Sequence, residues 1–185
     1  MNESIESGGE ASPNELVEVL ASNDHLRRQK ARRDLTKLGK SVVPQLRDLL
    51  RSHSEHARWE AAKVLGNIGG KEAVEALATL LPDSSHDVRW TAVEGLIEGG
   101  ESAYHPVLHQ LVIHSSNIGV REAASHILGR AVRDDHSTFL QPVLHALRGR
   151  APVFEVSLAA YQALTTLHRN QARLDTARFR KSEER

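Results

Sequence analysis

The sequence predicts an all-α protein in which five two-helix units stack into a solenoid. Three observations lead to this prediction: one residue pattern recurs at intervals of 30 to 36 residues, a second apolar pattern lies between its copies, and the composition suits helices. Leucine, alanine and valine are plentiful, whereas aromatic residues make up only 4% of the 185 residues. That balance favours helices packed through small and aliphatic side chains over a β-sandwich, which is enriched in aromatic and β-branched residues.

The first pattern predicts the second helix of each unit, which we call helix B. Counted from its first residue at position 0, the pattern has alanine at +3, leucine at +7 and, in three copies, glycine at +11. Positions +3 and +7 lie on one face of an α-helix, and glycine can adopt the left-handed conformation that ends a helix. The copies begin at Arg28, Arg58, Arg89 and Arg121, and a weaker fifth copy begins at Ser157.

The second pattern predicts helix A, a shorter apolar helix that precedes each helix B. Pro44, Pro106 and Pro142 stand at equivalent places, and proline is tolerated in the first turn of a helix because its missing N–H is not needed there. One helix pair cannot bury its apolar face alone, so neighbouring units must stack to form a core. The copies of helix A span residues 14–20, 43–50, 74–81, 105–112 and 141–147.

Two stretches carry a resemblance to a known family, 88-VRWTAVEGLIEGG-100 and 64-VLGNIGGKEAVEALATLL-81. They resemble the bacterial HEAT-like repeat, the short variety that also occurs in phycobilin lyases. This resemblance implies a right-handed α-solenoid of about five two-helix HEAT-like repeats, with the B helices on the concave face. Tetratricopeptide and ankyrin repeats are excluded because their W-x-x-L-G-x-x-Y and T-P-L-H patterns are absent. Arrays of this kind mostly serve as interaction surfaces.

We expect three segments in the chain. Residues 1–12 form a flexible acidic N-terminal tail, residues 13–168 form the repeat array, and residues 169–185 form a charged C-terminal extension. The tail is polar and glycine-rich and lacks the features of a signal peptide. No apolar run approaches the ~20 residues needed to cross a bilayer. We therefore expect a cytoplasmic protein without a membrane partner.

The composition argues against several kinds of chemistry. The 24 basic residues balance 24 acidic ones, so no overall field attracts nucleic acid, and the absence of cysteine excludes disulfides, thiolate catalysis and cysteine-bound metal. There is no phosphate-binding glycine loop and no G-x-S-x-G motif. Glu101, His105 and His109 share one side of a predicted helix A and are possible metal ligands, but the spacing forces no third imidazole close to them. We expect neither a cofactor, nor a metal, nor catalysis.

The resemblance also raises enzymatic alternatives. Some HEAT-like proteins are di-iron hydroxylases whose His-Glu dipeptides supply iron ligands, but this chain has no such dipeptide, and Trp59 stands where a histidine would. Phycobilin lyases use the same repeat, so a lyase-like or chaperone subunit for a tetrapyrrole chromophore is one alternative. Nucleic-acid binding through the basic termini, residues 27–33 and 169–185, is another, although the neutral overall charge argues against it.

The ladder formed by Arg28, Arg58, Arg89 and Arg121 has two interpretations. It could bind anions, or each arginine could tie neighbouring units together by bonding a carboxylate or carbonyl group in an inter-helix turn. The family resemblance favours the second interpretation, with Asp87 as a candidate partner of Arg89. Such charge-assisted hydrogen bonds contribute roughly 1.5–3 kcal/mol when they are sheltered from water.

We expect positions +2, +5 and +9 of each helix B to point away from the A helices and to line the concave face. Along this face the charge changes from basic through mixed to acidic and back to weakly basic. Alternation of this kind suggests a protein partner with complementary patches rather than a phosphate backbone. In the fifth unit these positions are Ala159, Gln162 and Thr166.

Two tryptophans, Trp59 and Trp90, stand at +1 of adjacent units, so we expect their rings to be close together. The repeat does not require tryptophan there, because the other units have other residues, and tryptophan is enriched among binding anchors. The sequence therefore predicts a non-catalytic module or scaffold that binds another protein through the concave helix-B face. The predicted contact residues are Arg33, Lys37, Trp59, Lys63, Trp90, Glu94 and Glu98.

Overall fold

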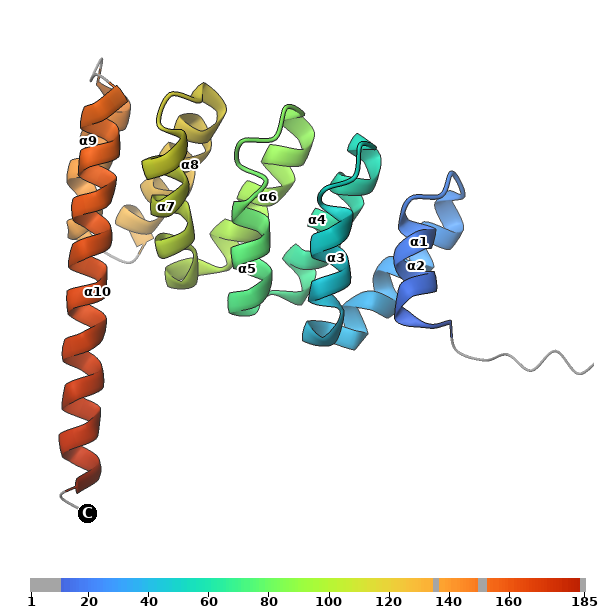
Figure 1. The fold of residues 1–185 in the computed structure, drawn as a ribbon, viewed down its shortest axis with the longest axis horizontal. Helices are drawn as coiled ribbons and strands as arrows, with labels where there is room; N and C mark the ends of the chain where they lie inside the picture. The colour runs from blue at the N-terminus through green and yellow to red at the C-terminus, as the bar shows by residue number, and fades with distance from the viewer. Residues whose placement is uncertain (1–10, 135–136, 150–152, 184–185) are drawn as a thin grey trace, which may run out of the picture.

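The computed structural model describes residues 11–134, 137–149 and 153–183, and every secondary-structure element in these stretches is a helix. Ten α-helices and three short 3₁₀ helices lie in this part of the chain, and successive helices pack side by side in two layers (Figure 1). The predicted all-α solenoid is therefore confirmed. Most of the predicted N-terminal tail, residues 1–10, lies outside the described residues.

Four regular units make up most of the array, each with helix A in one layer and helix B in the other. Two 3₁₀ helices, η1 (Gly39–Val42) and η2 (Gly100–Ala103), lead into the A helices of the second and fourth units. The A helices are α1 (Pro13–Leu20), α3 (Val43–Leu49), α5 (Gly70–Ala78) and α7 (Tyr104–His114), and the B helices are α2 (His25–Leu38), α4 (Glu55–Ile68), α6 (His86–Glu98) and α8 (Ile118–Asp134).

Local side-chain chemistry explains where three of the B helices begin and end. The side chains that cap α2, α4 and α6 each accept a hydrogen bond from the backbone N–H three residues later, which satisfies an otherwise unpaired donor. The predicted helix-ending glycines at +11 have φ angles of 62°, 63° and 53°, a range that glycine adopts without strain. The caps are Asp24, Ser54 and Ser85, and the glycines are Gly39, Gly69 and Gly100.

The core is a continuous apolar layer between the A and B helices. In all four regular units the leucine at +7 is fully buried and the alanine at +3 is at most 1% exposed. Small residues also let α4 and α6 approach closely, because a Cβ on Gly95 would lie only 3.1 Å from the Cα of Gly66. The repeat pattern is thus a packing pattern, as the sequence predicts.

The last unit is turned over relative to the other four. Its helices are α9 (Gln141–Arg148), which follows η3 (Thr138–Leu140), and the long α10 (Val153–Glu183). Helix α9 packs on α8, whereas α10 packs mainly on α7 and α9. Figure 1 accordingly shows α10 in the row of A helices, with α9 behind it in the row of B helices.

The prediction that the fifth copy continues the B layer is therefore wrong. Helix α10 does bury the matching residues, Ala160 and Leu164, but it buries them in the A layer. An apolar stripe fits either layer of a two-layer array, so the pattern alone does not choose between them. Ala159, Gln162 and Thr166 consequently do not extend the face formed by the other B helices.

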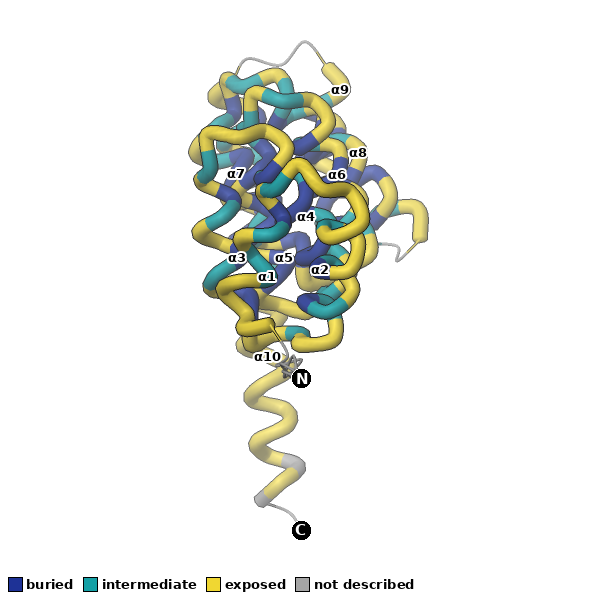
Figure 2. The backbone as a smooth tube through the Cα atoms, turned by 90° about the vertical axis from the view of Figure 1, so that its right-hand side faces the viewer, coloured by how far each residue is buried: buried dark blue, intermediate teal, exposed yellow. Residues whose placement is uncertain are grey.

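Helix α10 leaves the array after Leu167. Every side chain from His168 to Arg180 is exposed, and Figure 2 shows this part of the helix projecting from the stacked units. The predicted C-terminal extension thus starts inside α10, and its first residues continue that helix. The boundary at residue 168 stays a prediction about where the array ends.

Candidate protein-binding surface

Positions +1, +5 and +9 of the B helices form one outward stripe, which we call the B-face stripe. Its side chains are exposed or half-buried in all four regular units, because positions four residues apart lie on one side of an α-helix. The seven predicted contact residues all lie on it. The stripe consists of Gln29, Arg33 and Lys37 on α2, Trp59, Lys63 and Asn67 on α4, Trp90, Glu94 and Glu98 on α6, and Glu122, His126 and Arg130 on α8.

Position +2 does not belong to this surface, contrary to the sequence-based expectation. From the second unit onwards it faces the preceding B helix and is buried, with Glu60 only 2% exposed. The Glu60 carboxylate accepts a hydrogen bond from Nε of Arg28 (3.1 Å) and lies 3.4 Å from Nε of Arg32, both on α2. Lys30 remains exposed because no B helix precedes α2 in the described chain.

Trp59 is a partly covered ring at the centre of the second unit. The His56 ring lies nearly parallel to it, with centroids 6.1 Å apart, and Nζ of Lys63 stands 4.9 Å from the ring centroid. A cation over an indole face is attracted to it electrostatically. Trp59 therefore already contacts two side chains of its own helix, His56 and Lys63.

Trp90 is the more available of the two tryptophans, because 45% of its surface is exposed. It stacks on His86 of its own helix, with centroids 6.4 Å apart, and meets His126 of α8 at 5.2 Å. Within the described residues, the ring that Trp90 contacts in a neighbouring unit is this histidine and not Trp59. The expected pairing of the two tryptophans is thus replaced by a row of rings from α6 to α8.

The first three arginines of the ladder are structural, as the second interpretation proposes. Arg58 donates to both carboxylate oxygens of Asp83 (2.7 and 2.9 Å) and to the Ser52 carbonyl (2.9 Å). Arg28 bonds Glu60 and the Ser22 carbonyl, and Arg89 bonds the Asp83 carbonyl at 2.8 Å. Asp87, the predicted partner of Arg89, is instead an exposed residue beside His86.

Asp83 is the centre of the strongest of these links. Burial by itself would raise the pKa of its carboxyl group, but the hydrogen bonds from Arg58 and from the Ser85 backbone N–H reverse this and lower the pKa. The same pairing raises the pKa of Arg58. Two guanidinium nitrogens of Arg58 bond the two carboxylate oxygens of Asp83, and this pair links the helix B of the second unit to the loop inside the third unit.

A comparison with protein families agrees with this geometry. Residues 13–97 match the family described as HEAT repeats. Residues 13–97 are HEAT repeats. No curated protein matches the chain. HEAT repeats commonly mediate protein binding and are typically non-catalytic. The matched part runs from α1 into α6 and contains all of the predicted contact residues except Glu98.

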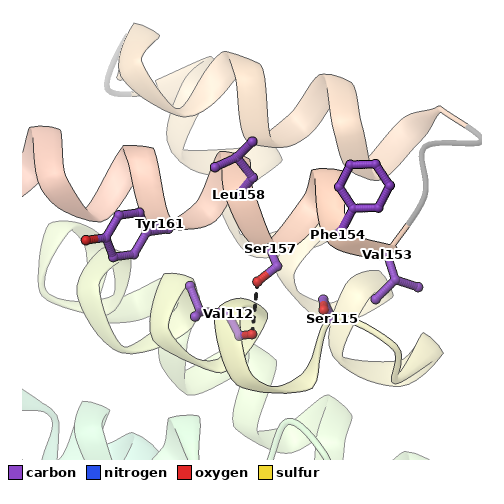
Figure 3. A pocket seen from close by; sticks show the side chains of 7 residues that line it. All are labelled: Val112, Ser115, Val153, Phe154, Ser157, Leu158 and Tyr161. Carbon is purple, nitrogen blue, oxygen red and sulfur yellow. Dashed lines mark hydrogen bonds between the residues drawn. The ribbon is translucent and has the colours of Figure 1, made fainter.

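The C-terminal end of the array carries a second exposed surface that the sequence does not predict. An open, apolar pocket of about 830 Å³ lies between α7 and α10, beside Phe154, Leu158 and Tyr161 (Figure 3). These three side chains are 68%, 52% and 61% exposed, while Oγ of Ser157 donates to the Val112 carbonyl at 3.1 Å. Sequence reasoning missed this pocket because it placed α10 in the other layer.

Three histidines lie close together where α7 packs against α10. The His105 ring lies 6.5 Å from His109 on α7 and 5.1 Å from His168 on α10. Partial burial, followed by the nearby His168 and His109, lowers the pKa of His105. In the described ranges, no three side chains of the histidine, aspartate and glutamate type are placed to hold a metal ion. None of the described helices combines the length and the apolar character that crossing a membrane requires.

Proposed function

We propose that the protein is a non-catalytic scaffold that binds another protein across the B-face stripe, with Trp90 as the central anchor. The observation that carries this proposal is an indole that is 45% exposed on a helix held from both sides by neighbouring helices. Exposed tryptophan on a rigid support offers a large contact area with little loss of conformational entropy. HEAT repeats supply such supports in series.

The surroundings of Trp90 support the same assignment. The charge of the stripe changes sign along the array, from Arg33 and Lys37 on α2 to Glu94 and Glu98 on α6. A partner with complementary charges would bind in one register, because like charges would face each other in any other. In the four regular units, the B helices also pack on one another more extensively than the A helices do, as expected for the inner, concave layer of a solenoid.

The test compares two doubly substituted proteins as baits. In the first, Trp90→Ala is combined with Glu94→Lys on the B-face stripe. In the matched control, Tyr161→Ala is combined with Glu155→Lys on α10, so that each variant loses one exposed aromatic ring and reverses one exposed acid. Both variants should keep the helical circular dichroism of the parent, because all four side chains are exposed.

We expect the B-face variant to lose at least about 2 kcal/mol of binding free energy for the partner, roughly a 30-fold weakening, and the α10 control to bind like the parent. Quantitative capture with purified baits at several concentrations measures this difference. If the B-face variant still binds the partner and the control does not, the binding site is the apolar pocket on α10 and not the B-face stripe.

A further inference from the structure

A second pocket lies on the B side of the array, where α9 replaces the helix B of a fifth unit. It opens between α8 and α9, has a volume of about 590 Å³ and is predominantly basic. We call it the arginine pocket. Its polar lining consists of Arg121, Glu122, Ser125, His126, Arg133 and Arg148.

The guanidinium groups of Arg133 and Arg148 both lie near Gly129. A Cβ placed on Gly129 would lie 3.6 Å from Nη1 of Arg133 and 3.9 Å from Nη2 of Arg148, so these two nitrogens are less than about 8 Å apart. Within the described residues, neither arginine pairs with a carboxylate, and the nearby Asp134 pairs with Arg130 instead. The positive charges of Arg133 and Arg148 therefore lie near each other at the surface, and the described residues provide no counter-ion for them.

Arg121 lines the same pocket near the other end of α8, about 18 Å along the helix from Arg133. The equivalent arginines of the first three units each donate to the carbonyl six residues before them. In the part of the chain that the structure describes, Arg121 has no such bond and no acidic partner, and it lines the pocket instead. Among the described residues, Arg121 is thus the ladder arginine without a hydrogen bond to the turn before its own helix.

We propose that the arginine pocket binds a phosphoryl group, the dianionic end of a phosphate monoester. The pocket lining carries three guanidinium groups and one carboxylate, that of Glu122, and the guanidinium groups of Arg133 and Arg148 lie near enough to each other to bind one dianion together. A guanidinium fork matches the oxygens of a phosphate group. Ser125 supplies a hydroxyl donor and His126 an imidazole.

The phosphoryl group could belong to free phosphate or to a phosphorylated side chain of a protein. The position of His126 connects the pocket to the B-face stripe, because this ring also contacts Trp90 at 5.2 Å. A phosphorylated side chain bound here would lie at the end of the surface proposed for the partner. The site itself is built from residues of α8 and α9 and does not depend on the proposed protein-binding function.

The test is an NMR titration of the ¹⁵N-labelled full chain with inorganic phosphate at constant ionic strength. We expect saturable shifts of the amide signals of α8 and α9, with those of α2 unchanged. The double variant Arg133→Ala with Arg148→Ala should bind at least tenfold more weakly. The matched control, Arg169→Ala with Arg173→Ala, removes the same charge from the exposed part of α10 and should bind like the parent.

A second pair of variants tests the pocket without removing an arginine. Gly129→Glu places a carboxylate between the two guanidinium groups and should abolish phosphate binding. Gly129→Gln fills the same space without charge and should weaken phosphate binding less than Gly129→Glu does. Absence of saturable shifts with inorganic phosphate, or equal affinity in the two arginine double variants, would overturn the proposal.

A second titration with a phosphoserine peptide distinguishes the two sources of the ligand. Binding at least tenfold tighter than that of inorganic phosphate, lost on dephosphorylation, supports a phosphorylated side chain. Equal affinity for both supports free phosphate as the ligand. This experiment needs no partner protein, so its failure would leave the capture experiment with the Trp90 variant unaffected.

Discussion

Arg58 in the second unit and Arg121 in the fourth occupy the same position of the repeat but have different roles. Arg58 is fixed by Asp83 in the loop that precedes the next B helix and by the carbonyl of Ser52. In the described chain, Arg121 has neither a carboxylate partner nor a hydrogen bond to the carbonyl six residues before it, and it lines the arginine pocket instead. The comparison shows that one position of the repeat can link two units in one place and line a pocket in another.

The same contrast holds for whole helices. Helices α2, α4, α6 and α8 bury their +3 and +7 residues between the two layers and keep one stripe exposed. Helix α10 buries the same kind of residues but from the other layer, and this leaves Phe154, Leu158 and Tyr161 exposed at the end of the array. The second, third and fourth units have described neighbours on both sides, while the last unit has a described neighbour on one side.

The largest difference between the two regions should come from removing an acidic residue. Asp83→Ala leaves Arg58 sheltered and without its carboxylate, so we expect a loss of about 2–4 kcal/mol in the free energy of unfolding. Glu122→Ala in the arginine pocket should change it by less than about 0.5 kcal/mol, because no described ion pair is broken. Urea unfolding of both variants measures the difference. Equal losses would show that the Arg58–Asp83 pair contributes no more to the free energy of unfolding than Glu122 does.

A pair of glycine substitutions should give the next largest effect. In Gly95→Ala the new Cβ would lie 2.6 Å from Cδ1 of Leu77, so we expect a loss of roughly 1–2 kcal/mol from the close packing of α4 and α6. In Gly129→Ala the nearest side-chain atom is 3.6 Å away, and the better helix propensity of alanine should stabilise the protein by about 0.5–1 kcal/mol. Urea unfolding measures the change in the free energy of unfolding for both variants. A loss for Gly95→Ala with a gain for Gly129→Ala supports the comparison, whereas changes in the same direction contradict it.

Acidification should weaken the junction of α7 and α10 more than the regular units. Because the pKa of His105 is lower in the folded than in the unfolded chain, its neutral form contributes stability above the unfolded pKa of about 6.5, which is lost as the pH falls through the folded pKa. His105→Gln should reduce the decrease in Tm between pH 7.5 and 5.5 by about 2 °C or less, since the ring is partly exposed.

The control for this pH experiment is His25→Gln in the first unit, an exposed histidine that contacts no other ring in the described chain. The control should leave the pH dependence of Tm unchanged. A pH dependence that is the same in the parent and in His105→Gln would show that the three histidines do not act on this junction.

The smallest effect should come from shortening the chain. A protein that ends at residue 168 loses only exposed side chains of α10 among the described residues, so its free energy of unfolding should stay within about 0.5 kcal/mol of the parent. Thermal and urea unfolding test this. A loss above about 1 kcal/mol would place the end of the array beyond the predicted boundary.

Most of the regular units could be predicted from the sequence because the residues concerned repeat in phase. Glycine at +11 ends three B helices with positive φ, and the alanine and leucine at +3 and +7 are buried, as expected. The prediction failed at position +2, where Glu60 is buried against α2. A helical wheel identifies the side opposite to helix A, but it does not show where the preceding B helix will lie.

Positions +5 and +9 of the B-face stripe could be predicted from the sequence, whereas +2 was expected in place of +1. Trp59 and Trp90 are distinctive because the repeat does not demand them, and both lie on the stripe. Lys63 stands four residues after Trp59 on the same helix, so their contact follows from local spacing. The contact of Trp90 with His126 joins two units and depends on packing angles that no single unit encodes.

The sequence by itself determined the helices, their ends and the two-layer repeat, because periodicity and turn chemistry are local properties of the chain. Only the tertiary structure decided that the last unit is turned over, because an apolar stripe on α10 can be buried in either layer. That choice leaves Arg121, Arg133 and Arg148 around an open pocket and exposes Phe154, Leu158 and Tyr161. Surfaces made by two helices follow from how the helices meet, and that is a property of the assembled array.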